Sequence, residues 1–280
     1  MHKKKSVTAV FILLAATSLF SFDGAVDAKN NGSLFNLDPI LEGILFASSA
    51  GLNGIVLYFD KVGEVNHSKF DGNIIDSSQV NGFDQLLMNS YSSAIDKLGT
   101  YFGIVSILTP TILLVAPMDQ WLTIGTMYAE TITLAYGFKE LGKICINKAR
   151  PYMYFEGFPK DAVNDHDWNK SFPSGHTTMS FAGASFTSLV FSKYFPNSKW
   201  KIPVIASSYV IAFSTAACRV ASGDHFLTDV IAGAIAGTAC GFFVPWIHSL
   251  NINTQKVGTN STYDVSVQAI PMGAVLSIKY

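Results

Sequence analysis

The sequence is short of charge. Aspartate, glutamate, lysine and arginine make up only 14% of its 280 residues, whereas an ordinary soluble domain carries about 25%. Hydrophobic residues supply 49%, and the mean hydropathy is +0.30. These values exclude a typical soluble domain and predict a membrane protein, and the length predicts one main domain.

Positive charge is not in excess. The 19 lysines and arginines are balanced by 20 acids, which leaves a net charge of −1, and the chain has no long basic run. A nucleic-acid-binding surface needs clustered cations. We therefore expect no nucleic-acid partner.

Cysteine is too rare for a disulfide framework. The three cysteines, Cys145, Cys218 and Cys240, lie in or near apolar segments and form no CxxC pair. An odd number in such positions is typical of packing. We expect neither disulfides nor a cysteine metal site.

The first 28 residues have the pattern of a secretory leader. A basic segment, 2–5, precedes an apolar segment, 7–22, and small residues offer a cleavage site after Ala28. The alternative is an uncleaved first anchor. Either pattern predicts export in a bacterial cell, followed by a membrane domain over 29–250 and a polar C-terminal tail over 251–280.

Six apolar stretches follow the leader, and a membrane helix needs about 20 residues. The first is the weakest, because Glu42, Asn53 and three glycines dilute it. The pattern predicts an all-α membrane bundle of about six apolar helices. The stretches are 40–59, 101–118, 121–138, 177–195, 202–218 and 226–247.

Three further segments carry a periodic pattern. Apolar residues recur at helical spacing over 86–98, which predicts an amphipathic helix along the membrane surface or on the bundle. Gly233, Gly237 and Gly241 form a small-residue stripe, which we interpret as packing inside one bundle rather than as a dimer face. The oligomeric state stays open. The tail alternates weakly over 263–280, which predicts a short hairpin.

Polar residues gather in three short blocks. In the first, Lys143 and Arg150 are seven residues apart, which is two helical turns, and Pro151 is expected to end that helix. Two neighbouring cations suit an anion between them. Lys139 and Lys148, in contrast, are expected to complement the helix end and lipid phosphates.

The second block runs from Pro173 to His176 and precedes an apolar stretch, so it lies at a helix N-terminus. Free backbone N–H groups there bind anions. Gly175 allows close approach to the backbone, and Ser174 can cap the helix or bind an oxygen. A helix cap alone would explain Ser174 but not His176.

The third block contains Arg219, His225 and Asp229. The last two are four residues apart, so the carboxylate can reach the imidazole and stabilise its charged form. Gly223 predicts a turn that brings Arg219 back toward the same anion. We interpret the neighbouring Asp224 as a solvated loop residue.

Together the blocks resemble the type 2 phosphatidic acid phosphatase superfamily, which includes bacterial acid phosphatases and vanadium haloperoxidases. Its pattern is Lys-x6-Arg-Pro, Pro-Ser-Gly-His and Ser-Arg-x5-His-x3-Asp. The chain matches every spacing, and the similarity in helix layout spans 40–247. Cys218 stands where the family has serine, and a thiol is a weak hydrogen-bond donor.

The resemblance implies that Lys143, Arg150 and Arg219 hold the phosphate oxygens. Ser174 and the N–H group of Gly175 would assist them. Fixed cations of this kind stabilise the charge that develops on the oxygens during phosphoryl transfer.

The resemblance also implies the catalytic roles. His225 would attack phosphorus to form a phosphohistidine, and Asp229 would orient it. His176 would protonate the leaving alcohol and then activate water. The resemblance implies no metal and no cofactor. The loop 164–167 contains possible ligands, but it has no matching second cluster, and we interpret it as solvated.

These expectations define a function to test. The leading one is an integral-membrane phosphatase acting on a lipid phosphate monoester or diphosphate. The alternatives are an exported acid phosphatase that uses soluble esters and a non-catalytic lipid-phosphate binder. Binding alone requires only cations, so the additional presence of His176, His225 and Asp229 counts against a binder. The lipid head group stays open.

Loop charge predicts the orientation. Alternating helices place the loops 60–100, 139–176 and 219–225 on one side. The other side carries Lys193, Lys199 and Lys201, and lysines in short loops mark the cytoplasm. This predicts an inner-membrane protein whose active site faces the periplasm. A cleaved leader followed by six spans gives the opposite orientation unless 40–59 is re-entrant or interfacial.

Overall fold

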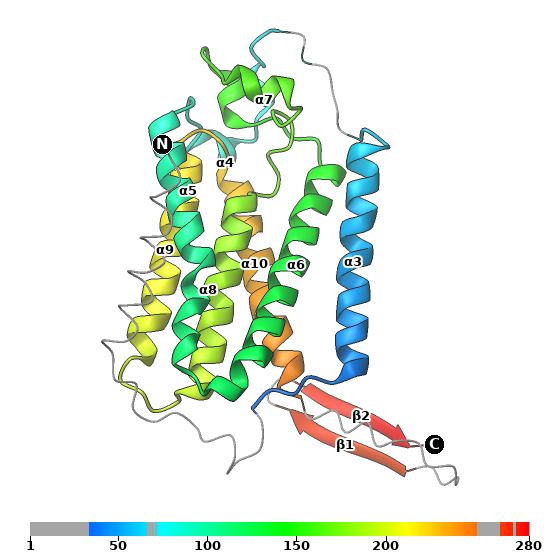
Figure 1. Cartoon of the computed structure of the whole chain (residues 1–280). Helices are drawn as coiled ribbons and strands as arrows, with labels where there is room; N and C mark the ends of the chain where they lie inside the picture. The colour runs from blue at the N-terminus through cyan, green and yellow to red at the C-terminus, as the bar shows by residue number, and fades with distance from the viewer. Residues whose placement is uncertain (1–33, 66–69, 71, 251–263, 271–272, 280) are drawn as a thin grey trace, which may run out of the picture. The chain divides into compact units, whose positions relative to one another are not determined.

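The computed structural model describes residues 34–65, 70, 72–250, 264–270 and 273–279. Its contacts divide the chain into two units at residue 250. In the first unit six long helices dominate (Figure 1): α3 Pro39–Lys61, α5 Ser93–Ile107, α6 Trp121–Cys145, α8 Gly175–Tyr194, α9 Lys201–Ala221 and α10 Leu227–His248. Short helices lie between them: η1 Ser77–Gln79, α4 Gly82–Gln85, η2 Thr109–Val115, η3 Met118–Gln120, η4 Pro151–Tyr154 and α7 Lys160–Asn164.

Helix α8 is the central helix of the bundle and packs against α5, α6, α9 and α10. Of its 20 residues, 14 are buried, although many are serine or threonine. The Oγ1 atom of Thr187 donates to the Gly183 carbonyl at 2.8 Å, and the Ser188 hydroxyl donates to the Ala184 carbonyl at 2.7 Å. Satisfied hydroxyls of small residues allow neighbouring helices to approach closely.

The glycine stripe of α10 lies against α8. A Cβ atom on Gly237 would lie 2.1 Å from the Thr178 carbonyl oxygen, and one on Gly233 would lie 2.7 Å from that of Ser174. Such distances leave no room for any side chain. The interpretation of the stripe as packing inside one bundle is therefore confirmed.

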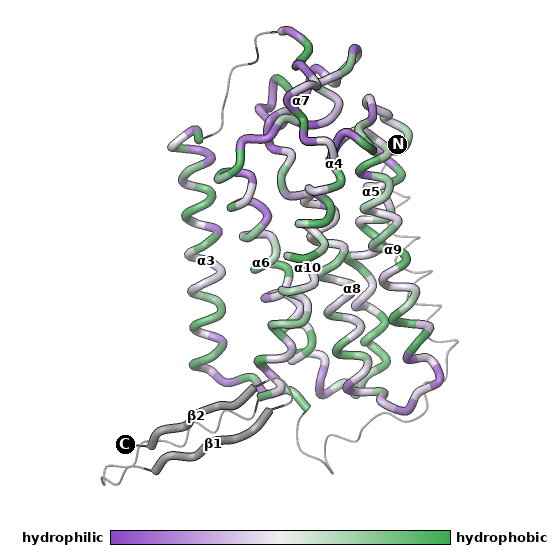
Figure 2. Tube along the Cα trace, turned by 180° about the vertical axis from the view of Figure 1, so that it is seen from behind, coloured by the Kyte–Doolittle hydropathy of each residue, from purple (hydrophilic) through white to green (hydrophobic). Residues whose placement is uncertain are grey.

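Four helical segments are long and apolar enough to cross a membrane, counted over the described residues: α3, 93–115, α9 and α10. Figure 2 shows hydrophobic residues along the helices and hydrophilic ones gathered around α7 and its adjoining loops. The predicted all-α membrane bundle is confirmed, but the number of six spans stays a prediction. Helices α6 and α8 are long enough to cross a membrane but are less apolar than these four segments. Helix α6 carries several charged residues, and α8 is rich in hydroxyl groups.

Helix α3 was the weakest predicted stretch, yet it is continuous over 23 residues. Asp38 caps its N-terminus by accepting from the N–H groups of Ile40 at 2.9 Å and Leu41 at 3.1 Å. The helix lies at the edge of the bundle beside α6 (Figure 1). A continuous helix of this length favours a membrane span over a re-entrant segment.

The predicted amphipathic helix over 86–98 is wrong in its first half. Helix α4 ends at Gln85 and α5 begins at Ser93. Between them the chain binds the turn after α9, because Asn89 donates to the Val220 carbonyl at 3.2 Å and the Ser92 N–H donates to the Ser222 carbonyl at 3.0 Å. This tertiary contact outweighs the helical periodicity.

The second unit contains a β-hairpin. Strand β1 (Asp264–Ile270) pairs antiparallel with β2 (Gly273–Lys279), with Ile270 opposite Gly273. The predicted hairpin in the tail is thus confirmed. The leader over 1–28 lies outside the described residues.

Candidate active site

A cavity of about 650 Å³ opens at the end of the bundle that bears α7. Residues from all three polar blocks line it, together with side chains from α5, α6 and α7. Six of the eight predicted site residues reach this cavity: Lys143, Arg150, Gly175, His176, Arg219 and His225. Ser174 and Asp229 are fully buried and are not part of its lining.

Arg150 reaches the cavity from an extended segment. Helix α6 ends at Cys145, and the Arg150 N–H donates to the Trp168 carbonyl at 2.8 Å. The prediction that Lys143 and Arg150 share one helical face is therefore wrong. The Arg150 guanidinium donates to the Asp167 carboxylate at 2.7 Å and to the Asp224 carbonyl at 3.1 Å.

Arg219 lies in the last turn of α9 and is 4% exposed. Its guanidinium donates to Asp96 at 2.5 Å and pairs with Asp224 at 2.8 Å. Its Nε atom is buried without a hydrogen-bond partner among the described residues. Asp224 is buried rather than solvated, which corrects its interpretation as a loop residue.

The pKa values of Asp224 and Asp167 shift in opposite directions. Burial raises the pKa of Asp224, and Arg219 opposes that rise only in part. Burial would also raise the pKa of Asp167, but Arg150 and Lys143 hold that pKa below its usual value. Asp167 belongs to the loop considered for metal binding. Its carboxylate pairs with Arg150, and this contact connects the loop to the site.

Lys143 and Lys139 enter the cavity from the C-terminal part of α6. Lys143 lies 3.9 Å from Glu140, and Lys139 contacts the same carboxylate. The stem of Lys139 lies 3.1 Å from the position of a Cβ on Gly175. Lys139 is buried, so its interpretation as a lipid-facing residue is wrong.

The Pro173–His176 block forms the N-terminus of α8, as predicted. The Ser174 N–H donates to the Asp229 carbonyl at 3.0 Å, and its hydroxyl accepts from Thr177 at 3.0 Å. Ser174 therefore joins α8 to α10, and its hydroxyl does not cap a backbone N–H. His176 is exposed, and its side chain lines the cavity.

His225 follows a tight turn at Gly223, whose φ of 76° suits glycine. Its Nδ1 lies 2.8 Å from the Ser171 carbonyl, which can only accept, so Nδ1 carries the proton. The lone pair is then on Nε2, 3.2 Å from Arg150 Nη1. Burial, followed by the charge of Arg150, lowers the pKa of His225 to about 3, against the opposing effect of Asp229.

Asp229 supports His225 at longer range than predicted. Its Oδ2 lies 3.8 Å from His225 Nδ1, beyond a hydrogen bond. The same oxygen accepts from the Ser171 hydroxyl at 2.5 Å and from the Phe226 N–H at 2.9 Å. Asp229 therefore acts on the imidazole through its field and by fixing Ser171.

Lys148 was missed as part of the site. Its ammonium lies 2.7 Å from Asp229 Oδ1, 2.9 Å from Asp84 and 2.8 Å from the Thr228 hydroxyl. It neutralises two fully buried carboxylates and does not serve lipid phosphates, which corrects its interpretation. Asp84 comes from α4, far away in sequence, so only the fold brings it here.

The PAP2 superfamily model matches residues 125–253. This range contains all three polar blocks and all eight predicted site residues. Over this range the chain is similar to the PAP2 superfamily, the family that the three blocks resemble.

Two curated relatives share part of the chain. Lipid phosphate phosphatase 1 of Arabidopsis thaliana is 32% identical over 140 residues, which cover 43% of this chain and 42% of that protein. A bacitracin transport permease protein of Bacillus licheniformis is 33% identical over 107 residues, or 38% and 48% of the two chains. The chain spans about half the length of these relatives.

Among solved structures, a transmembrane PAP2-type phosphatidylglycerolphosphate phosphatase from Bacillus subtilis is similar. It is 19% identical with a TM-score of 0.42, and the match covers 76% of this chain and 98% of that one.

Proposed function

We propose that this protein is an integral-membrane phosphatase that hydrolyses a lipid phosphate monoester or diphosphate through a phosphohistidine. The observation that carries the proposal is the placement of His225. Its Nε2 lone pair lies beside the Arg150 guanidinium at the wall of a cavity that also contains Lys143 and Arg219. A nucleophile is thus held next to donors for the oxygens of the group it attacks.

The arginines already bind carboxylates in this structure. Arg150 pairs with Asp167, and Arg219 pairs with Asp96 and Asp224. A phosphoryl group presents similar oxygen acceptors with more charge, and guanidinium groups bind such oxygens in pairs. The unpartnered Nε of Arg219 adds one more donor for it.

The proposed reaction has two chemical steps. His225 Nε2 attacks phosphorus while the P–O bond to the lipid breaks, and His176 gives its proton to the departing alcohol or phosphate. Water then attacks phosphorus, His176 takes its proton, and the P–N bond returns its electrons to His225. Lys143 and the arginines stabilise the oxygens in both transition states.

A lipid substrate fits the apolar part of the lining. Ile104 and Ile107 of α5 and Met179 of α8 line the same cavity as the cations. Ile104 is also among the exposed hydrophobic residues of α5. The phosphate would bind at the polar end while the hydrocarbon chain lies along α5. The Arabidopsis thaliana relative is named a lipid phosphate phosphatase, which agrees with this class.

A panel assay tests the proposal. Purified protein is given phosphatidate, phosphatidylglycerophosphate, undecaprenyl diphosphate, lipid A and p-nitrophenyl phosphate, with His225→Ala as control. We expect phosphate release from at least one lipid with kcat/KM at least tenfold above the soluble ester. Preference for the soluble ester would support an acid phosphatase. Binding without release would support a lipid-phosphate binder.

A further inference from the structure

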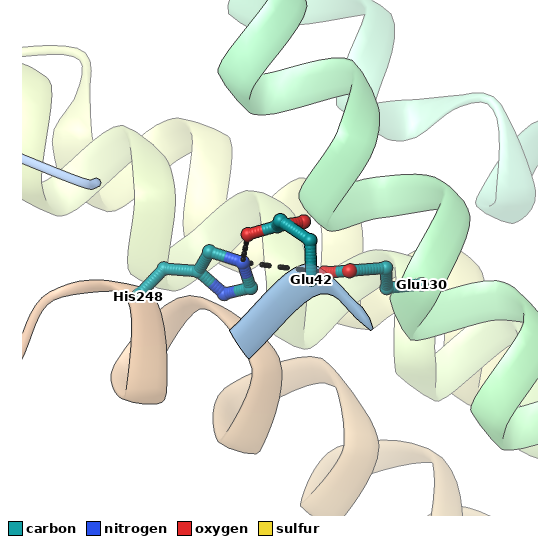
Figure 3. A group of neighbouring side chains, drawn as sticks. All are labelled: Glu42, Glu130 and His248. Atoms are coloured by element: carbon teal, nitrogen blue, oxygen red, sulfur yellow. Dashed lines mark hydrogen bonds and ion pairs between the residues drawn. The ribbon is translucent and has the colours of Figure 1, made fainter. Parts of the chain in front are cut away.

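A second polar cluster lies far from the active site. It consists of Glu42 in the first turn of α3, Glu130 of α6 and His248, the last residue of α10 (Figure 3). Asp229 and His248 belong to opposite ends of α10. At 1.5 Å per residue, about 29 Å of helix separates them. The cluster is therefore independent of the catalytic chemistry.

In this cluster one nitrogen atom of His248 and one carboxylate oxygen from each glutamate lie close together. His248 is fully buried, and its Nδ1 donates to the Val244 carbonyl at 2.8 Å. In the neutral imidazole the Nε2 atom then has a lone pair. It lies 2.9 Å from Glu42 Oε1 and 3.3 Å from Glu130 Oε2, as the dashed lines in Figure 3 mark. One ligand atom from each residue lies within 4.8 Å of the others.

These charges lack balance. Within the part of the chain that the structure describes, no lysine or arginine forms an ion pair with Glu42 or Glu130. The Oε2 atoms of both glutamates are buried without a hydrogen bond to any described residue. Two carboxylates in an apolar bundle cost several kcal/mol when nothing neutralises them. A cation bound between them would supply the missing positive charge.

We propose that Glu42, Glu130 and His248 bind a divalent transition-metal ion, Zn²⁺ or Mn²⁺. Two carboxylates and a neutral imidazole balance the charge of one such ion. At metal–ligand distances of about 2.0–2.1 Å, tetrahedral ligand atoms lie about 3.3 Å apart, close to the 2.9 and 3.3 Å found here. Imidazole disfavours Mg²⁺ and Ca²⁺, which prefer oxygen ligands.

The remaining features match a metal-binding histidine. A carbonyl bound to Nδ1 fixes the tautomer that presents Nε2 to a metal, and the Val244 carbonyl has this role. The three ligands come from three helices. The ion would fasten α3, at the edge of the bundle, to α6 and α10. At the same end of the bundle, the Asn36 N–H donates to the His248 carbonyl at 2.9 Å.

Metal titration of the full-length protein tests the site. Purified protein without a histidine tag is treated with a chelator, and Zn²⁺, Mn²⁺ or Mg²⁺ is added back. We expect one equivalent of Zn²⁺ to bind at least 100-fold more tightly than Mg²⁺ and to raise the melting temperature. Failure to bind Zn²⁺, or a melting temperature that no metal changes, overturns the proposal and leaves protons as the balancing charge.

Variants test which residues are metal ligands. Glu130→Gln and His248→Gln should weaken Zn²⁺ binding at least 100-fold. Glu140→Gln, on the same helix α6 but at its other end, should leave the affinity within threefold. Wild-type affinity in His248→Gln contradicts the assignment. If a variant does not fold, pulsed EPR of the wild-type Mn²⁺ complex decides: coupling to an imidazole nitrogen supports the site, and its absence sinks it.

Discussion

At the residue scale, His225 is the side chain on which the proposed chemistry depends. The Ser171 carbonyl determines its tautomer, Arg150 lies beside its lone pair, and Asp229 contributes from 3.8 Å. None of these contacts requires a bound metal. This placement is what the proposed role of His225 as a neutral nucleophile requires.

His225→Ala should abolish turnover and leave the protein folded, since the imidazole is the proposed nucleophile. His176→Ala should lose at least 100-fold of the rate on lipid substrates, because an alkoxide leaves poorly without an acid. On p-nitrophenyl phosphate it should accumulate phosphoenzyme, which mass spectrometry detects at His225. Retained activity in His225→Ala, measured beside a folded wild type, would rule the nucleophile out.

The pKa of His225, lowered to about 3, predicts a pH dependence. The folded imidazole should stay neutral from pH 8 to 5, whereas an unfolded one takes up a proton near pH 6.5. Stability should therefore fall as the pH drops below 6.5, and less so in His225→Ala. Histidine NMR measures the titration directly. A His225 resonance that titrates between pH 6 and 7 contradicts this expectation.

Sequence alone predicted the residues of the site better than their contacts. The spacings identified Lys143, Arg150, Arg219 and the two histidines, and all line one cavity. They could not reveal Lys148 bound to Asp229 and Asp84, because the two partners are 145 residues apart in the chain. Long-range contacts of this kind depend on tertiary packing, which local patterns do not encode.

At the element scale, small residues determine how closely the helices approach. The stripe on α10 was visible in the sequence because glycine recurs at every fourth position. The break between α4 and α5 was not, since it depends on Asn89 and Ser92 binding the turn after α9. Periodicity predicts a helix, and a turn elsewhere in the fold decides where it begins.

Gly237→Ala tests the closest helix contact. The new Cβ would lie 2.1 Å from the Thr178 carbonyl oxygen, so α8 and α10 must separate, at a cost of about 1–3 kcal/mol or more. Gly125→Ala is the matched control, because nothing lies within 4 Å of its Cβ position. It should be neutral or stabilise by about 0.5–1 kcal/mol. Thermal unfolding in detergent measures both, and equal stabilities would contradict close packing.

At the scale of the whole molecule, the two polar centres lie at opposite ends of the bundle. The cationic cavity lies at the α7 end, and the Glu42, Glu130 and His248 cluster lies at the other. Glu42 and His248 are 206 residues apart in the chain, so no local sequence motif could predict that they lie together. The 164–167 loop contains possible metal ligands in the sequence, although we interpreted it as solvated, and its Asp167 pairs with Arg150.

Chelation should therefore separate the two centres. EDTA should lower the melting temperature by emptying the cluster, but the initial rate per folded molecule at 20 °C should change less than twofold. Vanadate should inhibit, because it adopts the five-coordinate shape of the transition state. Loss of rate in EDTA, restored by Mg²⁺ or Zn²⁺ while the protein stays folded, would require a catalytic metal.

Orientation in the membrane is the last property to test, and we propose that the cavity faces the periplasm. Lys193, Lys199 and Lys201 lie at or near the loop between α8 and α9, at the end opposite the cavity, and lysines in short loops resist export. Phe35 packs against Tyr194 at that end. With α3 spanning, the chain just before it must then be cytoplasmic. A leader that crosses the membrane and is removed predicts the reverse.

Cysteine labelling separates these orientations. In a background without Cys145, Cys218 and Cys240, single cysteines replace Asn164 and Asn197, which are both exposed. A membrane-impermeant maleimide applied to intact spheroplasts should modify the probe at 164 and not the one at 197, whereas both should react after lysis. The reverse pattern would place catalysis in the cytoplasm. It would also mean that the basic leader has a stronger effect on the orientation of the bundle than the lysines near α8 and α9.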